Sequence, residues 1–560
     1  MNRFISAILL SFFVVFLGCS YSEPTKDPVF EWFVYEGNDP VYNELEVAEN
    51  EYLNPILAGF YPDPSIVRVN EDYYMVNSSF GFYPGIPIFH STDLVSWTQL
   101  GHVLDRPSQL DLDSLETSQG VFAPTIEYNE GTFYVINTLV NGRGNFFVTA
   151  TNPAGPWSDP VWLPKIGGID PSFFFDDDGK VYIVHNDEPE GRPLYDGHRA
   201  IRIHEFDPET QTTGVNQIVI NGGADISKKP VWIEGPHIIK VNGEYFLHAA
   251  EGGTGPGHSQ VVFKSENILG PYVPYEENPI LTQRTLDQNR PNPIAFTGHA
   301  DLVETQNGDW WAVFLGVRPY EGNYFNTGRE TFLLPVTWKD GWPVILEENK
   351  PVPLKGARPN LPTQGVPEIP TNGNFTLKDN FDNETLADYW AFIRTPREKW
   401  YDLSDGLKIK ARTDHINSLG NPSFIGRRLQ HMYASASTKM IYDPEEIGNE
   451  AGLIAFQNKD YYYFLGLMKN PEGETIIQVE YSAGPKSRVI TRKSLPINKK
   501  GEVYLKIEAR GDKLDFYYAL KEGSWTKLYW DGDAKILSTE SAGGFVGSFI
   551  GMYAYSETEE

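Results

Sequence analysis

Apolar and polar positions alternate in short runs along most of this chain, and one such pattern occurs five times between residues 63 and 315. Each copy starts at a polar or small residue, continues as a short apolar strand, turns, and returns as an aromatic-rich strand. The copies start at Asp63, Ala123, Asp170, Glu234 and His299, which are 60, 47, 64 and 65 residues apart. Repeats of this length with about four short strands each predict a β-propeller, here with five blades.

A turn signal separates the two strands of every copy. Glycine and asparagine in such turns supply the positive φ angles that short hairpins need. The turns are Asn70-Glu-Asp, Asn129-Glu-Gly131, Asp176-Asp-Asp-Gly179, Asn242-Gly243 and Asn307-Gly-Asp309. Immunoglobulin-like repeats are a competing architecture, but they would not place acidic residues at the matching start of three units.

The rest of the chain lacks long helical periodicity, so the expected fold class is all-β. Dense prolines between residues 349 and 373 are typical of a semi-rigid linker. Strand-like runs alternate with turns after the linker and predict a β-sandwich. The expected organisation is a signal peptide at 1–19, an irregular tether at 20–50, the propeller at 51–348, the linker at 349–373 and the sandwich at 374–560.

The N-terminus carries an apolar run from Phe4 to Leu17. Its fourteen residues are too few to cross a bilayer, so we interpret the run as an export signal. The run ends at Gly18-Cys19, which resembles a bacterial lipoprotein cleavage site with Cys19 as the lipid-bearing residue. This predicts an exported protein of the bacterial cell envelope that meets the membrane only through an N-terminal lipid anchor. The alternative is a plain signal peptide with an incidental cysteine.

Composition narrows the classes of chemistry and partner. Cys19 is the only cysteine in 560 residues, so thiol nucleophiles, zinc–thiolate sites and disulfides are excluded from the folded body. The net charge of −29 argues against nucleic acid and anionic membrane surfaces as partners, because phosphate groups would be repelled. Aromatic residues make up 14% of the chain, which fits either β-sheet packing or stacking on sugar rings.

Three of the five copies start with a carboxylate, and equivalent positions of a propeller converge on its axis. Asp63, Asp170 and Glu234 are therefore expected to share one cavity. One protonated and one ionised carboxyl on either side of a glycosidic bond are the usual groups for hydrolysing it. A third carboxylate nearby raises the pKa of the acid by repulsion. Each residue alone is ordinary, since Asp-Pro is a common turn dipeptide, but the matching positions favour catalysis.

Four segments, in this order, resemble family 43 glycoside hydrolases. They are Asn54-Pro-Ile-Leu-Ala-Gly-Phe-Tyr-Pro-Asp63-Pro-Ser, Gly168-Ile-Asp170-Pro-Ser-Phe, Glu234-Gly-Pro-His and Gly298-His299-Ala-Asp. The likeness is closest to the β-xylosidase and α-L-arabinofuranosidase branch and runs from about Asn54 to the end. It implies a concanavalin A-like β-sandwich after the propeller.

The resemblance implies an inverting mechanism with one role for each acid. Asp63 would be the general base that activates water, Glu234 the general acid, and Asp170 the residue that orients Glu234 and raises its pKa. Inversion leaves room for water, so the carboxyls of Asp63 and Glu234 should lie roughly 6.5–9.5 Å apart. Retaining five-bladed relatives that act on fructosides use an Asn-Asp-Pro-Asn type motif, which does not occur here.

The family pattern also implies substrate-binding residues around the acids. Arg329 would donate to sugar hydroxyls, the alternative being a salt bridge to a carboxylate of the propeller. Phe80 and Phe122 would line the pocket, the alternative being packing within the blades; relatives often have Trp where Phe122 stands. His299 would lie under the active site, where some relatives hold a water-bound calcium ion, the alternative being a hydrogen-bonded core histidine. No cofactor is required, because carboxyl groups alone can move the protons.

The segment from Asn421 to His431 resembles the loop that family sandwiches lay against the propeller mouth, which would favour removal of single terminal sugars. The expected activity is release of xylose, arabinose or both from the non-reducing ends of xylan-derived oligosaccharides. The competing enzymes are an arabinofuranosidase or endo-acting arabinanase that trims side chains. The competing class is a non-catalytic glycan-binding propeller. The sequence does not distinguish xylose from arabinose as the sugar that is released.

Overall fold

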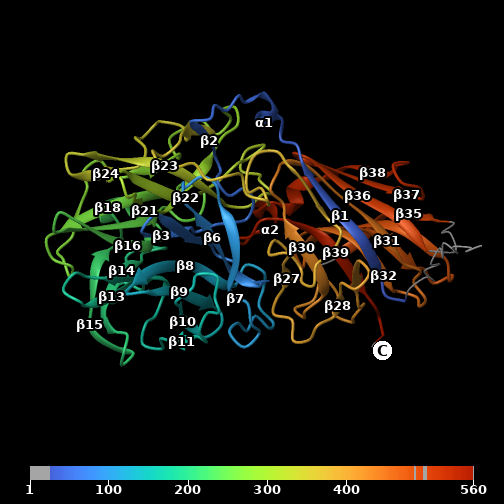
Figure 1. Cartoon of the computed structure of the whole chain (residues 1–560), viewed down its shortest axis with the longest axis horizontal. Coiled ribbons are helices and arrows are strands. Elements are labelled where there is room, and N and C mark those ends of the chain that lie inside the picture. The colour runs from blue at the N-terminus through green and yellow to red at the C-terminus, as the bar shows by residue number, and fades with distance from the viewer. Residues whose placement is uncertain (1–25, 485–486, 496–500, 559–560) are drawn as a thin grey trace, which may run out of the picture.

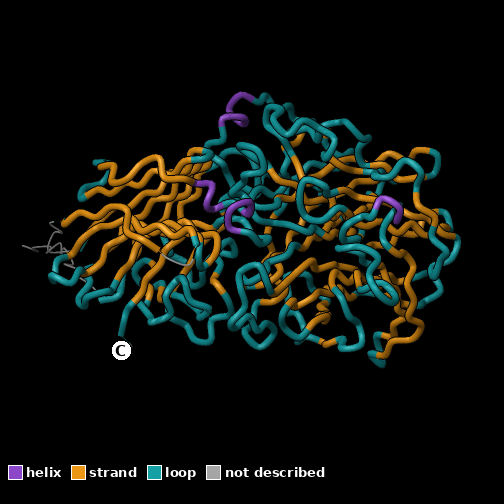
Figure 2. Tube along the Cα trace, turned by 180° about the vertical axis from the view of Figure 1, so that it is seen from behind, coloured by secondary structure: helices purple, strands orange, loops and turns teal. Residues whose placement is uncertain are grey.

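The computed structural model describes residues 26–484, 487–495 and 501–558. The predicted signal peptide and Cys19 lie outside these residues. Within them the chain is all-β, with two short α-helices, α1 (Pro40–Glu44) and α2 (Thr539–Ala542), and two 3-10 helices, η1 (Ile226–Lys228) and η2 (Ala534–Leu537). The strands gather in two groups that lie side by side (Figures 1 and 2).

The first group consists, in the described part of the chain, of five antiparallel sheets that follow one another in sequence. The first sheet contains β3 (Ser65–Val69), β4 (Asp72–Val76), β6 (Gly85–Ser91) and β7 (Thr98–Leu104), and the second contains β8 (Gly120–Asn129), β9 (Thr132–Val140), β10 (Gly144–Ala150) and β11 (Val161–Trp162). The third sheet contains β12 (Ile169–Phe175), β13 (Val181–Asp187), β14 (Ala200–Asp207) and β15 (Thr212–Asn221), and the fourth contains β16 (Glu234–Val241), β17 (Glu244–Glu251), β18 (Ser259–Ser265) and β19 (Val273–Pro274), with β20 (Leu281–Thr282) also on β18. The fifth sheet contains β21 (Ala295–Glu304), β22 (Trp310–Val317), β23 (Glu330–Lys339) and β24 (Trp342–Val344).

The first strands of these sheets form a closed cycle, so the five sheets together make a ring. β3 contacts β8, β8 contacts β12, β12 contacts β16, β16 contacts β21, and β21 returns to β3. Alternate residues of a strand face the two neighbouring sheets, as the period of two requires. Tyr182 and Val184 of β13 pack with Leu247 of the fourth sheet, whereas Val181 and Ile183 pack in the cluster shared with the second sheet. The predicted short apolar strands therefore bury both faces.

The second group is a sandwich of two sheets. The larger sheet has the order β28 (Tyr401–Asp402), β29 (Leu407–Ile409), β1 (Val29–Gly37), β31 (Tyr433–Ile441), β36 (Glu502–Arg510), β37 (Lys513–Ala519) and β38 (Thr526–Asp533), with β26 (Thr376–Asp379) also on β1. The smaller sheet has the order β30 (Ser423–Arg428), β39 (Phe549–Tyr555), β32 (Glu450–Asn458), β33 (Tyr461–Lys469), β34 (Thr475–Ala483) and β35 (Ser487–Ser494). Ala436 and Leu505 of one sheet and Leu453 and Val479 of the other belong to one core.

The prediction of an irregular tether over residues 20–50 is wrong for residues 29–37. These residues form β1, which pairs with β31 on one side and with β29 and β26 on the other. β1 buries Phe30, Phe33 and Tyr35 in the sandwich core. A register shift between Phe30 and Trp32 interrupts the alternation of apolar and polar residues, and its partner β31 lies far along the sequence. Both features hide the strand from a local pattern search.

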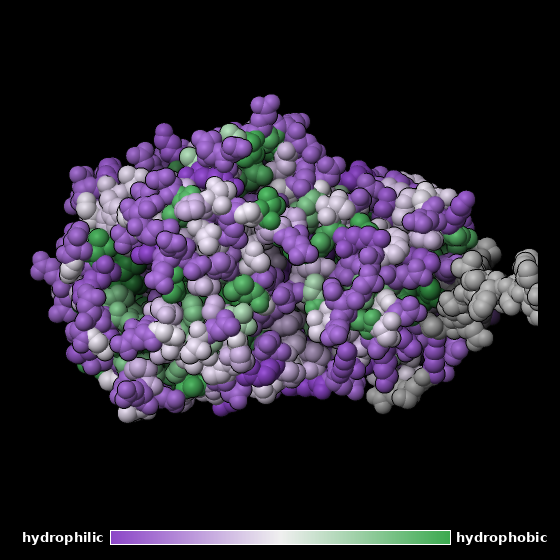
Figure 3. Space-filling view, viewed as in Figure 1, coloured by the Kyte–Doolittle hydropathy of each residue, from purple (hydrophilic) through white to green (hydrophobic). Residues whose placement is uncertain are grey.

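A pair of short strands joins the two groups, since β5 (Phe82–Tyr83) of the first group pairs with β27 (Phe392–Ile393) of the sandwich region. Another short pair, β2 (Glu51–Leu53) with β25 (Lys355–Ala357), lies on the first group, where Tyr52 packs with Trp311 and Leu333. Hydrophilic residues dominate the face shown in Figure 3. One apolar core cluster runs from the first two sheets into the sandwich, with Ile88 and Val135 at one end and Leu453 and Leu505 at the other. No helix among the described residues has the length and apolar character needed to cross a bilayer.

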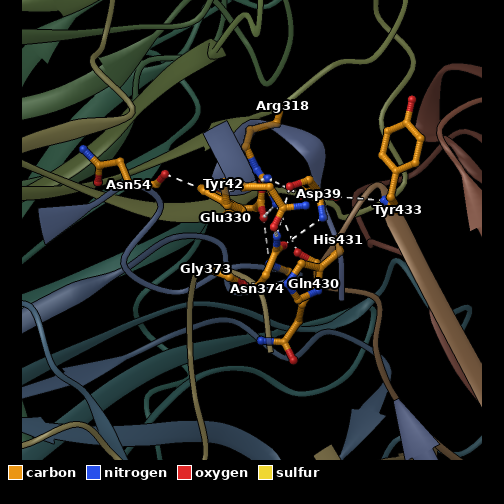
Figure 4. A network of polar contacts seen from close by, with 12 residues as sticks. Asp39, Tyr42, Asn54, Arg318, Glu330, Gly373, Asn374, Gln430, His431 and Tyr433 are labelled. Carbon is orange, nitrogen blue, oxygen red and sulfur yellow. Dashed lines mark hydrogen bonds and ion pairs between the residues drawn. The ribbon is translucent and has the colours of Figure 1, made fainter. Parts of the chain in front are cut away.

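A buried polar network also joins the two groups (Figure 4). Arg318, just after β22, donates to both carboxylate oxygens of Glu330 at 2.6 and 2.8 Å and to Asp39 at 2.9 Å. Its Nη2 also donates to the carbonyl of Gln430 at 3.1 Å. Glu330 accepts the backbone N–H of Gly59 at 2.8 Å. The N-terminal segment, the fifth sheet and the sandwich thus meet at Arg318. Its partner Glu330 directly follows the predicted binding residue Arg329 in the chain.

Candidate active site

A cavity of about 600 Å³ lies at the end of the ring where the first strands begin, and it contains every site residue that the sequence predicts within the described chain. Those residues are Asp63, Phe80, Phe122, Asp170, Glu234, His299 and Arg329. Asp63 precedes β3, Asp170 lies in β12, Glu234 begins β16 and His299 lies in β21. Four different sheets therefore bring the predicted polar residues together.

The first strands leave regular pairing where these residues stand. Register shifts occur at Phe122/Thr125, Ile169/Ser172, Glu234/His237 and Gly298/Asp301. Prolines follow the anchors because proline has no N–H for the ladder and is found at bulges. They are Pro64, Pro124, Pro171 and Pro236. Asp63, Asp170 and His299 also have φ angles of 52°, 55° and 50°. A bulge bends the strand and re-aims its side chain, here toward the shared cavity.

Asp63 is held as an anion. Arg329 donates to Asp63 Oδ1 at 2.7 Å and approaches Oδ2 at 3.4 Å, and the hydroxyl of Ser78 donates to Oδ2 at 2.7 Å. Burial opposes ionisation, but Arg329 and the Ser78 hydrogen bond outweigh it and lower the pKa of Asp63 below its usual value. Arg329 thus makes the salt bridge that was the alternative interpretation, while still lining the cavity.

Glu234 keeps its proton to a higher pH than an ordinary glutamate. Removal from solvent and the negative charge of Asp63 raise the pKa of Glu234 to about 7, although Arg329 and Arg199 oppose the shift. Burial and repulsion from Glu234 and Asp63 also raise the pKa of Asp170. This repulsion is mutual, so Asp170 and Glu234 do not both ionise near pH 7. The cavity therefore holds the carboxylate of Asp63 together with carboxyl groups that can carry a proton, as general base and general acid chemistry needs.

The backbone after Glu234 is fixed by two of the predicted residues. The N–H of Gly235 donates to Asp170 Oδ2 at 3.2 Å. Gly235 has a φ of 54°, and a Cβ there would lie 2.6 Å from His299 Nε2. Only glycine fits this position, because the imidazole packs against its Cα. Asp170 and His299 thus fix the strand segment that carries Glu234.

Aromatic rings wall the Asp63 side of the cavity. The rings of Phe80 and Phe122 are 4.6 Å apart, and Phe545 of the sandwich lies 6.2 Å from Phe80 at an interplanar angle of 27°. The guanidinium of Arg329 lies 5.5 Å from the ring of Phe80 and 6.0 Å from that of Phe545. Phe80 and Phe122 therefore line the cavity and pack on each other, so both interpretations of these residues hold.

Phe545 is a site residue that the sequence analysis missed. Its N–H donates to Ser118 Oγ at 3.0 Å. A Cβ on the preceding Gly544 would lie 2.1 Å from the same Oγ, and Gly544 has a φ of 76°. The Gly543-Gly544 pair marks a close backbone approach, but nothing local says that the approach is to another domain.

The expected role of the segment from Asn421 to His431 is corrected in part. This segment contacts the ring, since Arg428 donates to the carbonyl of Phe60 at 2.7 Å and Gln430 donates to that of Ala58 at 3.0 Å. No residue of the segment lines the cavity, and Phe545 contributes the wall of the sandwich instead. Residues 423–428 are a strand of the smaller sheet, whose pairing with β39 keeps them out of the opening.

The surroundings of His299 do not form a direct metal site. The described residues contain no group of three or more His, Cys, Asp or Glu side chains arranged to hold a metal ion. The carboxylate next to His299 is Asp63, 3.8 Å away, and Arg329 already occupies it. Calcium needs six to eight oxygen ligands, which these residues do not supply directly. Burial lowers the pKa of His299 to about 4, so the imidazole is neutral.

Two family models match the chain. Residues 52–343 match Glycosyl hydrolases family 43, and residues 378–560 match the β-xylosidase C-terminal concanavalin A-like domain. A non-reducing end α-L-arabinofuranosidase of Bacteroides ovatus is 38% identical over 518 residues, which cover 91% of this chain and 92% of that protein. A xylosidase/arabinosidase of Butyrivibrio fibrisolvens is 38% identical over 513 residues, which cover 90% and 95%.

Solved structures agree with this match. The crystal structure of a GH43_12 protein from a capybara gut metagenome has a TM-score of 0.87 and 41% identity, and the match covers 96% of this chain and 100% of that one. The resemblance inferred from the four motifs is therefore confirmed. The chain belongs to glycosyl hydrolases family 43 and is a glycoside hydrolase.

Proposed function

We propose that this glycoside hydrolase removes terminal xylose, arabinofuranose or both from the non-reducing ends of xylan-derived oligosaccharides by one inverting displacement. The observation that carries the proposal is one cavity that holds both Asp63, which Arg329 and Ser78 pair as an anion, and Glu234, whose pKa burial and the charge of Asp63 raise to about 7. Relatives named xylosidase/arabinosidase and non-reducing end α-L-arabinofuranosidase support the substrate class.

Each acid has one task in this mechanism. Asp63 accepts a proton from a water molecule as that water attacks the anomeric carbon. Glu234 donates its proton to the leaving oxygen, which would otherwise depart as a poor alkoxide leaving group. Asp170 holds the backbone next to Glu234 through Gly235, and the carboxyl groups of Asp170 and Glu234 repel each other when both are ionised. Arg329 keeps Asp63 ionised and offers its remaining N–H groups to sugar hydroxyls.

We further propose that the five sheets are the blades of a five-bladed β-propeller, which the closed cycle of first strands supports. Phe545 then reaches from the sandwich over the end of the propeller axis, which favours removal of single terminal sugars over cleavage inside a chain. An arabinanase would need an open groove, and a purely glycan-binding propeller would have no use for a carboxylate beside a neutral acid. A water-bound calcium near His299 stays a prediction.

We also propose that the protein is an exported lipoprotein of the bacterial cell envelope. The apolar run from Phe4 to Leu17 followed by Gly18-Cys19 supports this. Mass spectrometry of the mature N-terminus tests it, since a free N-terminus at any other residue would contradict the assignment of Cys19.

Proton NMR of the products tests the proposed function. We expect a mixture of xylo- and arabino-oligosaccharides to release single xylose or arabinose units. The first anomer to appear should be opposite to that of the bond cleaved, because a single displacement inverts the anomeric carbon. Retention of configuration would contradict the roles of Asp63 and Glu234, and recovery of intact oligosaccharide would favour a binding protein.

The pH dependence should report the two acids. We expect kcat/KM to fall above pH about 7, where Glu234 loses the proton that it must donate. On the acid side it should fall only below the usual pKa of an aspartate, because Asp63 must be ionised. A pH profile of kcat/KM measures both limbs. In Glu234→Ala the alkaline limb should vanish on a substrate with an acidic leaving group; if it persists, another group controls it.

A further inference from the structure

Trp232 lines the cavity together with Glu234, which it precedes by two residues. Its side chain is 38% exposed, and it belongs to none of the apolar cores. Its φ of 52° is a left-handed conformation, which is strained for a bulky residue. Such strain persists where the surroundings fix it, and it concentrates at functional sites. Packing within the fold therefore does not account for this tryptophan.

Backbone hydrogen bonds hold the segment that carries Trp232. The N–H of Trp232 donates to the carbonyl of Gly197 at 2.9 Å, and the carbonyl of Val231 accepts from Gly252 at 2.7 Å. The side chain of Asn186 donates to the carbonyl of Ile233. The segment is thus fixed on both sides just before Glu234, so the indole ring is in place before a ligand arrives.

Arg199 stacks on the indole ring of Trp232. Its guanidinium lies 4.7 Å from the ring centroid of Trp232. Two of its nitrogens donate to Asn186 Oδ1 at 3.1 and 3.0 Å, and a third pairs with Glu188. Asn186 therefore links Arg199 to the segment between Trp232 and Glu234. Because Glu188 and the ring engage the arginine, its charge is not free to recruit an anion, and the exposed indole is the surface that remains for a ligand.

The aromatic residues of the cavity divide between its two catalytic acids. Phe80 and Phe545 lie against Arg329, which pairs with Asp63, and Phe122 packs on Phe80. Trp232 stands two residues before Glu234, and the arginine on its ring is Arg199 rather than Arg329. Glu234 protonates the oxygen of the leaving group, so whatever lies outward of Glu234 meets the leaving group rather than the sugar that is released.

We propose that Trp232, seated on Arg199, is the platform of the leaving-group subsite and stacks on the neutral sugar ring bonded through the scissile oxygen. This rests on the proposed function. The subsite selects oligosaccharide substrates by the apolar face of their second sugar, and it does not contact the sugar that is released. It is a specificity-determining contact, separate from the acids that carry out hydrolysis.

Paired substrates with the same terminal sugar test the subsite. One member is xylobiose or an arabinofuranosyl-xylose disaccharide, and the other is the matching glycosyl fluoride, whose leaving group is a single atom. We expect Trp232→Ala to lower kcat/KM for the disaccharide by about 10- to 100-fold, the loss of one ring-stacking contact. Its kcat/KM for the fluoride should stay within about twofold of the unaltered protein, which also shows that the variant folds. Trp232→Phe should recover most of the disaccharide activity.

Trp162 provides the matched control. It also stacks on an arginine, with Arg143 at 4.3 Å from its ring, but it does not line the cavity. Trp162→Ala should leave both substrates unaffected. Equal losses on disaccharide and fluoride in Trp232→Ala, or no loss on the disaccharide, would overturn the subsite while leaving the hydrolase intact. If the unaltered protein cleaved neither the disaccharide nor the fluoride, the proposed function would be overturned, and the subsite with it.

Discussion

Replacing Asp63 by alanine is expected to lower kcat by up to about 10⁴-fold on every substrate, the upper end of what a positioned general base contributes. The attacking water loses its proton whatever the leaving group is, so no choice of substrate should restore turnover. Steady-state kinetics on xylobiose, an aryl glycoside and a glycosyl fluoride measure the loss.

Glu234→Ala is the informative comparison. This variant should lose much of its kcat on xylobiose and little of it on an aryl glycoside with a strongly acidic leaving group, because such a group departs without a proton. Asp176→Ala is the matched control, because it removes a buried carboxylate of the same sheet as Asp170 that pairs with Lys240 and does not line the cavity. Equal losses by Asp63→Ala and Glu234→Ala on the aryl glycoside would contradict the assigned roles.

Replacing Arg318 by methionine is expected to lower the free energy of unfolding by about 3 to 5 kcal/mol, the usual effect of removing one member of a buried ion pair. The substitution leaves the carboxylates of Asp39 and Glu330 without their partner, and both are fully buried. Glu330 also fixes Gly59 and is adjacent to Arg329, so kcat should fall as well. Urea unfolding and kinetics of the same preparation measure the two effects.

Arg397 gives the control for this interface. It also bridges the two groups of strands, by pairing with Asp111 and Asp113, but its side chain is 46% exposed. Exposed pairs contribute about 0 to 1 kcal/mol, so Arg397→Met should change stability little. If Arg318→Met were as mild as Arg397→Met, the buried network would not be what holds the sandwich to the five sheets of the first group.

Local chemistry explains what the sequence predicts correctly. Asp170-Pro and Glu234-Gly-Pro stand at strand starts where pairing is irregular, and Asp63-Pro stands just before a strand, so the same short segments mark both the repeat and the site. The turn residues mark the hairpins for the same reason, because their positive φ is a property of single residues. Function and fold coincide at these positions, which is why one pattern predicts both.

Long-range pairing explains what the sequence does not predict. β1 has its partner β31 at residues 433–441, and its alternation is interrupted by a register shift. Phe545 reaches the cavity only because the sandwich docks beside Ser118. Trp232 has no repeat counterpart, and its role depends on the distant Asn186 and Arg199. None of these contacts is encoded within a window of neighbouring residues.

The position of β1 has a consequence for synthesis of the protein. Residues 29–37 leave the ribosome before the five sheets of the first group, but the strands beside them come from the last third of the chain. The sandwich can close only after almost the whole polypeptide has been made, and until then Phe30, Phe33 and Tyr35 have no permanent burial site. An expression product that stops after the fifth of these sheets would carry this apolar strand without a partner, and an unpaired strand edge of this kind promotes aggregation.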